Sequence, residues 1–453
     1  MASPRWLTVW ILAVLCLPIA AGAQVIERIS VSSAGVGGSG DSQLSCREAP
    51  ITSNGRYVVF ESDAPDLVPD DFNGVTDVFL RDRVLGTTTR LSVDTDGNDA
   101  DGASIRPCIT PDGHFVVFDS EATDLVPGDG NGEADVFLRD LTSGTTSRIS
   151  LDRFGGEANG GSRIPSISDD GRFVAFVSNA TDLIEGDGNG VADIFLRDRV
   201  LQLNERVSVD QSGGDPDANS WTPSMSSDGR YVAFHSVASN LVPGDGGVVD
   251  VFVRDRLLGS TVRATVSHLG SDPDGNSYGA SISADGRHVS FWSRATNLIP
   301  DDTNGFEDTY VRDLDLATTE RVSLRSDGSQ IPDLPSWTPS MSGDGRYVSF
   351  FADSDQLVPG DGNGFSDVFG LDRAADDLQL LTVNAAGQQT DDFNHNPKTT
   401  PDGRLLLFQS TATNLVADDT NNAIDIFLAY GPAILFGDGF EIGTTAGWQD
   451  VGP

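Results

Sequence analysis

Four short apolar runs, separated by turn residues, recur along almost the whole chain. In one stretch they cover residues 165–168, 173–178, 193–197 and 205–209. The second run is aromatic and β-branched, and the third reads IFLR, which fits buried strands better than amphipathic helices. After the first 23 residues, no stretch keeps an apolar period of 3.6. The pattern therefore predicts an all-β protein.

The four-run unit repeats at a nearly constant spacing. An Asp-Gly or Asn-Gly pair, typical of a tight hairpin, precedes the second run of each copy. The glycines of these pairs, called marker glycines below, are 57 to 59 residues apart: Gly55, Gly113, Gly171, Gly229, Gly286, Gly345 and Gly403. Seven copies of a four-stranded unit predict a seven-bladed β-propeller with one blade per copy.

The two ends of the repeat region complement each other. The seventh copy reaches its third strand at residues 425–428, but no fourth strand follows. Near the N-terminus, residues 27–31 read ERISV and match ERVSV at 205–209, the fourth strand of the third copy. We therefore expect the N-terminal segment to become the outer strand of the last blade, where it covers an otherwise unpaired edge.

The repeat resembles the TolB-type propeller repeat, a WD-like repeat of bacterial envelope proteins. The matching residues are SMSSDGRYVAF at 224–234 and DVFLRD at 135–140, and the resemblance extends over roughly residues 25–430. It implies the propeller fold. It implies no particular activity, because such propellers carry many unrelated functions. Seven repeats and the lack of a separate N-terminal domain distinguish this chain from TolB itself, so TolB's partners are not transferred to it.

Charge and the first residues restrict the compartment and the partners. With 68 acidic and 29 basic residues the formal net charge is −39, which argues against binding to nucleic acid or an anionic membrane and favours cations. Residues 1–23 resemble a signal peptide, with Arg5, an apolar stretch over 6–19 and a cleavage site after Ala23. We expect a secreted or periplasmic monomer without a membrane span, with a propeller over residues 24–430.

Two cysteines remain after the expected cleavage, Cys46 and Cys108. An even number of cysteines in an exported chain favours a disulfide. Counted from the marker glycines, however, the two positions are four residues out of register, which could separate their Cα atoms by more than the roughly 7 Å that a disulfide spans. The sequence leaves a disulfide and two free thiols as alternatives.

A long connection between the second and third strands carries an acidic pattern, D-x-N-[GN]-x-x-D, in six copies. Oxygen ligands on a glycine-containing loop suit calcium, so possible Ca²⁺ binding is one interpretation. An Asx turn with a capping aspartate is the other. The fourth copy keeps only Asp245 and Asp250. The six candidate metal sets are Asp71, Asn73 and Asp77; Asp129, Asn131 and Asp135; Asp187, Asn189 and Asp193; Asp302, Asn304 and Asp308; Asp361, Asn363 and Asp367; and Asp419, Asn421 and Asp425.

Positions that differ between copies are better candidates for ligand binding than positions that recur. Eight residues before each marker glycine lie Arg47, Ile105, Arg163, Trp221, Tyr278, Trp337 and His395. We expect them to enter the innermost strands, near one mouth of the central channel, where an aromatic crescent of Trp221, Tyr278 and Trp337 could stack on a sugar or grip a peptide. The candidate ligand-binding residues are Arg163, Trp221, Tyr278, Trp337 and His395. Packing that closes the channel is the alternative.

Arginines also recur in the fourth strands, at Arg90, Arg148, Arg206, Arg263 and Arg321, where a network of ion pairs explains them better than an anion site.

The sequence contains no recognisable catalytic motif. The five histidines occupy different repeat positions, no HExxH or G-x-S-x-G occurs, and no cysteine has an evident histidine partner. A non-enzymatic scaffold for a protein or glycan ligand is therefore the leading interpretation. A polysaccharide lyase or hydrolase with a site at the channel mouth, and a purely structural envelope protein, are the alternatives. The tail, 431–453, is interpreted as a sorting signal or as an apolar segment that docks on the propeller.

Overall fold

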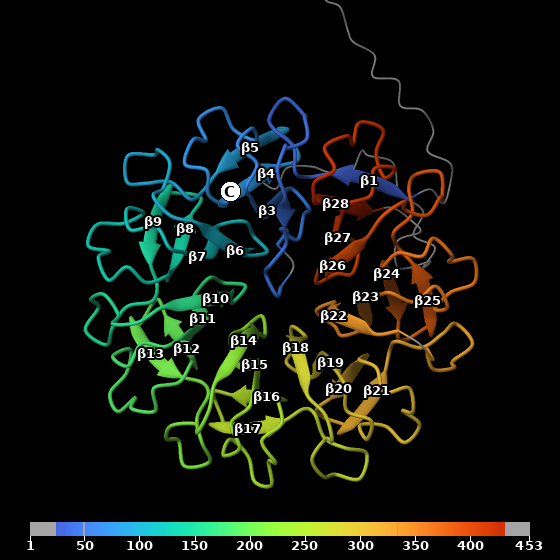
Figure 1. Cartoon of the computed structure of the whole chain (residues 1–453). Helices are drawn as coiled ribbons and strands as arrows, with labels where there is room; N and C mark the ends of the chain where they lie inside the picture. Colours follow the sequence, from blue (N-terminus) through green and yellow to red (C-terminus); the bar gives the residue numbers. More distant parts are fainter. Residues whose placement is uncertain (1–23, 49, 333, 431–453) are drawn as a thin grey trace, which may run out of the picture.

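The computed structural model describes residues 24–48, 50–332 and 334–430, which form seven four-stranded antiparallel sheets around one central axis (Figure 1). The predicted seven-bladed propeller is confirmed. No helix occurs among these residues, and hence none that could cross a membrane. The expected signal peptide and the C-terminal tail lie outside the described residues.

Each blade contributes one strand at each of four distances from the axis. The innermost strands are β2 (Ser42–Gln43), β6 (Ser104–Ile109), β10 (Ser162–Ile167), β14 (Ser220–Met225), β18 (Ser277–Ile282), β22 (Ser336–Met341) and β26 (Asn394–Thr399). The second strands are β3 (Tyr57–Ser62), β7 (Phe115–Ser120), β11 (Phe173–Ser178), β15 (Tyr231–Ser236), β19 (His288–Ser293), β23 (Tyr347–Ala352) and β27 (Leu406–Ser410).

The third strands are β4 (Asp77–Asp82), β8 (Asp135–Asp140), β12 (Asp193–Asp198), β16 (Asp250–Asp255), β20 (Asp308–Asp313), β24 (Asp367–Asp372) and β28 (Asp425–Tyr430). The outer strands are β5 (Thr87–Arg90), β9 (Thr145–Arg148), β13 (Leu203–Arg206), β17 (Ser260–Arg263), β21 (Thr318–Arg321), β25 (Asp377–Leu380) and, for the last blade, β1 (Val25–Arg28). Blades one to seven are numbered from β2 to β26 by their innermost strands.

The first strand of the chain closes the ring. β1 pairs antiparallel with β28, with Val25 opposite Tyr430 and Arg28 opposite Phe427, and Figure 1 shows the two strands side by side in blue and red. The sheet order β1-β28-β27-β26 makes β1 the outer strand of blade seven. The predicted closure is therefore confirmed, although the strand begins two residues earlier than the sequence match indicated.

The hydrophobic core lies between neighbouring blades. A phenylalanine of the second strand stacks on an aromatic ring of the third strand, as in Phe60 with Phe79 and Phe118 with Phe137, whose ring centres are 5.7 and 6.0 Å apart. These rings are fully buried, and burial of each stabilises the fold by about 1.5–3 kcal/mol. The packed sheets hold the innermost strands rigidly, and their ends form the two mouths of a channel.

The marker glycines are required by close packing as well as by the hairpin turn. Gly229 has a φ of +69°, and a β-carbon on it would lie 2.5 Å from the ring of Phe173 in the preceding blade. Its counterparts Gly171 and Gly286 meet Phe115 and Tyr231 in the same way. These three hairpins are thus seated on an aromatic ring of the preceding blade, and the positive φ explains why every copy keeps a glycine here.

Candidate functional site: the central channel and its mouths

A β-bulge in the innermost strand directs side chains towards one mouth of the channel, called the wide mouth below. In blade three the pairing shifts between Arg163, opposite Val177, and Ser166, opposite Ala175. Blades two to seven share this shift, and the bulge residues have positive φ: Arg106, Ile164, Thr222, Gly279, Thr338 and Asn396. Non-glycine residues seldom take this conformation, and bulges commonly re-aim side chains.

Aromatic side chains line the wide mouth over blades four to seven. We call them the aromatic arc: Trp221, His235, Tyr278, Trp292, Trp337, Phe351 and His395. The ring centre of His235 lies 5.7 Å from that of Trp221 and 5.4 Å from that of Tyr278. The ring centre of Tyr278 in turn lies 4.7 Å from that of Trp292. A second run links Trp337, Phe351 and His395 at 5.3 and 6.4 Å. All except buried His235 are half-buried, so each keeps part of its surface accessible.

The sequence identified four members of the aromatic arc and missed three. We expected Trp221, Tyr278, Trp337 and His395 at one mouth. The structure places Trp221 and Tyr278 in one run of contacting rings and Trp337 and His395 in another. The three others belong to second strands, six residues after the marker glycine, where the copies also differ: Glu61, Asp119, Val177, His235, Trp292, Phe351 and Gln409. Variation at this second position was the signal that could have found them.

Charged side chains occupy the wide mouth over blades one to three. Nη1 of Arg106 lies 2.8 Å from Oδ2 of buried Asp119, and the Arg106 backbone N–H donates to Glu61. Burial raises the pKa of Asp119 to about 6, an effect that Arg106 partly offsets. Arg163 reaches the rim, where its Nη2 pairs with Glu121 at 2.8 Å. The candidate ligand-binding residues are therefore not contiguous, because Arg163 belongs to the charged side.

Blade one carries an insertion that fills the channel. Ser42 pairs with Ser62 as Ser104 pairs with Ser120, but 13 residues separate Ser42 from Gly55 whereas 9 separate Ser104 from Gly113, a difference of four. The extra residues fall in the segment that follows strand β2, whose residues 44–48 are called the plug below and lead into the lumen. The expectation that Arg47 belongs to the innermost strand is therefore wrong. Gln43 takes that place, and Arg47 belongs to the plug.

A disulfide in the structure ties the plug to blade two. Cys46 and Cys108 are bonded, with their Cα atoms 5.4 Å apart, well within bridging range. The four-residue offset counted from the marker glycines equals the insertion, which carries Cys46 inward. The apparent mismatch in register is thus the reason that the two thiols can meet.

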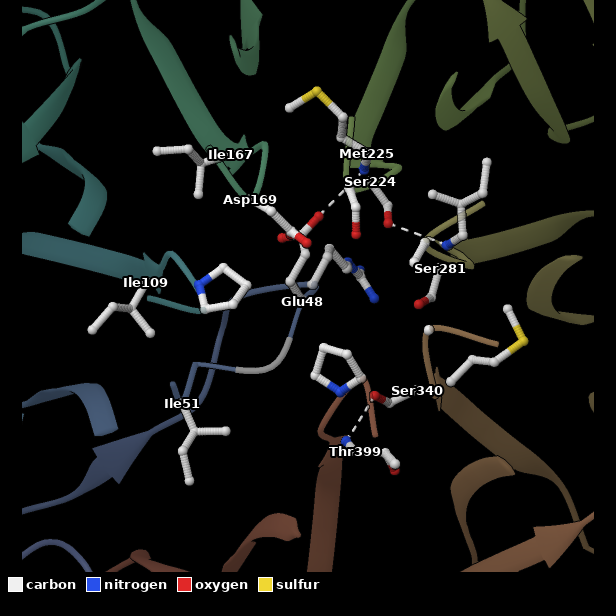
Figure 2. Close-up of a pocket in the computed structure, with 18 residues that line it drawn as sticks. Glu48, Ile51, Ile109, Ile167, Asp169, Ser224, Met225, Ser281, Ser340 and Thr399 are labelled. Atoms are coloured by element: carbon white, nitrogen blue, oxygen red, sulfur yellow. Dashed lines mark hydrogen bonds between the residues drawn. The ribbon is translucent and has the colours of Figure 1, made fainter. Parts of the chain in front are cut away.

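Glu48 of the plug crosses the axis to the far side of the channel. Its Oε1 accepts hydrogen bonds from Oγ of Ser166 at 2.6 Å and from the backbone N–H of Met225 at 3.3 Å. Figure 2 shows the side chain among residues that all seven blades contribute, including Ile51, Ile109 and Thr399. Burial raises the pKa of Glu48, and its hydrogen bonds and Lys398 partly offset that rise.

A belt of backbone hydrogen bonds constricts the opposite, narrow mouth. Between neighbouring hairpins the N–H of Asp169 donates to Ser227, Ser227 to Ala284, Ala284 to Gly343 and Gly343 to Pro401, at 2.8–3.1 Å. The N–H of Ser53 donates to Pro111 at 2.9 Å. The belt is interrupted after Pro111 and Pro401, because proline has no backbone N–H to donate to the next hairpin. Only a cavity of about 80 Å³ remains between this belt and the plug, enough for a few waters.

The acidic loops enclose an arginine in six of the seven blades. In blade one Nη1 of Arg90 lies 3.3 Å from Asp71 and 3.5 Å from Asp77. Arg148, Arg206, Arg263, Arg321 and, from β1, Arg28 take the same place in their blades. These guanidinium groups are at least nine-tenths buried, so they supply the positive charge that the carboxylates need.

The asparagines of these loops act as turn residues. Nδ2 of Asn73 donates to Asp77 at 3.0 Å, and its Oδ1 accepts the N–H of Val75 at 3.2 Å, an Asx turn. The same pair of bonds occurs at Asn189, Asn304, Asn363 and Asn421. In blade two Asn131 caps Glu133 but gives its amide to Ala158. Turn formation thus accounts for the asparagines without a metal.

Blade six keeps the two carboxylates and lacks the arginine. Its outer strand ends in Leu380 where the other blades have arginine. Asp361 accepts a hydrogen bond from Gln389 at 3.1 Å and faces the charges of Asp367 and Asp355. Burial, reinforced by these two like charges, raises the pKa of Asp361 to about 7. Among the described residues, this is the acidic loop whose two carboxylates have no arginine paired with them.

Comparison with known proteins identifies the fold and no more. No protein-family model matches the chain, and no curated protein matches it. An oligogalacturonate lyase in complex with manganese is similar over 91% of this chain and 98% of its own, at 12% identity and a TM-score of 0.54. An oligogalacturonate lyase from Vibrio parahaemolyticus is similar over the same shares, at 14% identity and a TM-score of 0.55.

TolB proteins are also among the similar structures. A putative TolB from Agrobacterium tumefaciens is similar over 76% of this chain and 94% of its own, at 18% identity and a TM-score of 0.41. At these identities the similarities show a shared propeller architecture, and the activity has to be argued from the site itself.

Proposed function

We propose that this protein is an exported, non-catalytic propeller that binds a glycan or protein ligand at its wide mouth. The observation that carries the proposal is the aromatic arc. It lies on the positions of the repeat that differ between copies, while the structural positions recur. Half-buried tryptophan and tyrosine rings held by neighbouring aromatics are rigid surfaces for stacking, and they bind at little cost in conformational entropy.

The polar groups of the mouth support binding rather than chemistry. Nδ1 of His235 lies 2.5 Å from Oγ1 of Thr222, and burial together with the nearby charge of Arg47 lowers the pKa of the histidine to about 3. Asp119 is engaged by Arg106. These groups are committed to holding the mouth in shape, which is the property that a preformed binding site needs.

Export and a monomeric state belong to the same proposal. The signal-like residues 1–23 and the Cys46–Cys108 bond both suit an oxidising compartment, either the periplasm or the exterior. The 23-residue tail would then act as a sorting or docking segment.

We further propose that calcium stabilises the fold through blade six rather than through all six loops. Asp361 and Asp367 keep the carboxylate oxygens that calcium prefers, Asp355 adds a third negative charge near them, and no described guanidinium forms an ion pair with any of the three. The tightest carboxylate cluster of the described residues, Asp129, Asp135 and Glu157, already encloses Arg148.

Truncation of the arc tests the main proposal. We expect the double variant W221A/W337A to lose at least tenfold in affinity for whichever glycan or envelope protein the wild type retains in a binding screen, because stacked rings contribute a large share of such binding. F154A is the matched control, since Phe154 is 82% exposed and outside the arc. Absence of any ligand for the wild type would favour a structural role, and turnover of a polysaccharide by purified protein would refute the non-catalytic part.

A further inference from the structure

Two cations at the floor of the wide mouth share one nearby carboxylate, Glu48, whose charge acts on both. Neither the Arg47 side chain nor the Lys398 side chain makes a hydrogen bond or an ion pair with any residue that the structure describes, and Lys398 is only 5% exposed. The other arginines of this mouth, Arg106 and Arg163, each form an ion pair with a carboxylate. A buried ammonium is costly without a counter-ion at hydrogen-bond distance, so Glu48 alone leaves one of the two positive charges unbalanced.

Lys398 replaces a serine in a ring that faces the lumen. Five residues before the marker glycine, four blades have Ser166, Ser224, Ser281 and Ser340, and blade seven has Lys398. The hydroxyl of Ser166 reaches Glu48 on the axis, which shows that this ring position points into the channel. Lys398 therefore extends a positive charge into the lumen from the side opposite Ser166.

Arg47 reaches the aromatic arc through a gap left by a glycine. Its Nη1 lies 3.6 Å from the position that a β-carbon on Gly279 would take, and Nε1 of Trp292 lies 2.8 Å from the same position. Gly279 is the only glycine among the bulge residues of blades two to seven. Its lack of a side chain leaves room for both the guanidinium and the indole beside Gly279, which directly follows Tyr278 in β18.

The lumen offers two cations and one carboxylate, which favours a singly charged anion as the ligand. Arg47 and Lys398 face Glu48, whose Oε1 is already bound to Ser166 and Met225. A ligand carboxylate supplies one further negative charge, which matches the one unbalanced cation better than the two charges of a phosphate dianion. The adjoining aromatic rings suit the face of a sugar.

We propose that the floor of the wide mouth binds the carboxylate of an acidic sugar, with Arg47 and Lys398 as its counter-ions and the aromatic arc against its ring. This inference rests on ligand binding at the wide mouth and adds the chemical class of the ligand. Buried charge pairs of this kind discriminate strongly, because the neutral analogue leaves both cations unpaired.

Matched acidic and neutral sugars test the inference by calorimetry. The probes are tetrasaccharides of glucuronate, mannuronate and galacturonate, each against its neutral parent. We expect the wild type to bind at least one acidic member roughly tenfold or more tightly than its parent. K398S, which restores the residue found in four other blades, should lose that preference and keep its affinity for the neutral sugar. R404Q, which removes a 79% exposed arginine, should behave as wild type.

Each outcome separates this inference from the proposed function. Equal affinity for acidic and neutral sugars, or a preference that survives in K398S, would overturn the carboxylate site and leave a glycan-binding mouth intact. If no tetrasaccharide binds, the acidic-sugar inference is wrong, and a peptide that binds only with a free C-terminal carboxyl would then point to a protein ligand. An unchanged melting temperature of K398S shows that any loss arises at the site rather than from unfolding.

Proton uptake provides a second readout. Burial, together with the like charge of Arg47, lowers the pKa of Lys398 to about 7, and Glu48 partly offsets this. A bound carboxylate favours the protonated amine, so affinity for the acidic sugar should fall as the pH rises through 7, with proton uptake on binding near that pH. K398S should show neither effect. A wild-type affinity independent of pH between 6 and 8 would contradict the role of Lys398.

Discussion

Nη1 of Arg28 lies 3.0 Å from Oδ1 of Asp419, which is 391 residues away along the chain. The same guanidinium reaches Oδ2 of Asp425 at 3.3 Å. Arg28 thus neutralises the buried carboxylates of the acidic loop in blade seven, as Arg90 and its counterparts do in their own blades. The N-terminal strand supplies a charge as well as a sheet edge, and the closure is electrostatic as well as hydrogen-bonded.

Removal of the closing strand should destabilise the whole propeller. Deletion of residues 25–31 leaves the edge of β28 unpaired and both buried aspartates without their cation, so the melting temperature should fall sharply. R28Q alone should cost about 3–5 kcal/mol, because it leaves buried charges uncompensated. R321Q, the same change inside blade five, is the control for the local ion pair. Calorimetry of the three variants checks this, and a melting temperature unchanged by the deletion would refute closure.

Calcium should act through blade six. Millimolar calcium should raise the melting temperature of the wild type. If the calcium concentration exceeds the Kd a hundredfold, the free energy of unfolding should increase by about 2.7 kcal/mol. L380R places in blade six the arginine that the other blades have, and it should abolish the calcium response without lowering stability in chelator. R321L should do the reverse, with lower stability in chelator and a new dependence on calcium in blade five. A calcium response that persists in L380R would exclude the blade-six site.

Stability without calcium should decrease as the pH rises towards 8. The folded-state pKa of Asp361, about 7, exceeds the ordinary value of 3.8, so the folded protein binds more protons than the unfolded chain between these values. The contribution of this group is therefore fully present below pH 4 and is lost as the pH rises through 7. D361N should weaken the dependence of the unfolding free energy on pH, and D376N, at an exposed position, should leave it unchanged. Asp250, with a pKa also raised to about 7 by burial, accounts for a further part.

Reduction of the disulfide should loosen the plug. The bond closes a loop between residues 62 apart, and its loss should cost about 2–4 kcal/mol. Melting of the C46S/C108S variant against wild type measures this effect, and titration of free thiols in denaturant establishes whether the bond is present. Two reactive thiols in the protein purified under non-reducing conditions would show that the cysteines are unpaired.

The architecture was predictable because it is repeated. Seven marker glycines stand at near-constant spacing, and each has the positive φ of its hairpin, so they are seven indications of one unit. The closing strand was recognisable because ERISV copies a fourth strand. Its boundaries shifted by two residues because pairing with β28 continues back to Val25, which the sequence match does not cover.

The candidate site was less predictable because it depends on departures from the repeat. The four-residue insertion between Ser42 and Gly55 shifted the count, which misplaced Arg47 and made the spacing of the two cysteines look unfavourable. The ion pair of Arg90 with Asp77 joins residues 13 apart in different strands, so the acidic loops alone suggested a metal. Leu380 is the one outer-strand position of this kind without an arginine, and the sequence shows this. Its effect on the acidic loop of blade six is clear only once the structure shows that the arginines of the other blades contact their loops.

Closure by β1 sets an order of assembly. The strand that leaves the ribosome first pairs with the one that leaves last, so the ring cannot form until blade seven has been made. Until then six blades can stack only as an open arc, with Val25–Arg28 waiting unpaired at one end. A chain that stops before β28 therefore lacks the partner for its own beginning, and premature termination anywhere along the repeats would yield an incomplete, adhesive intermediate rather than a smaller propeller.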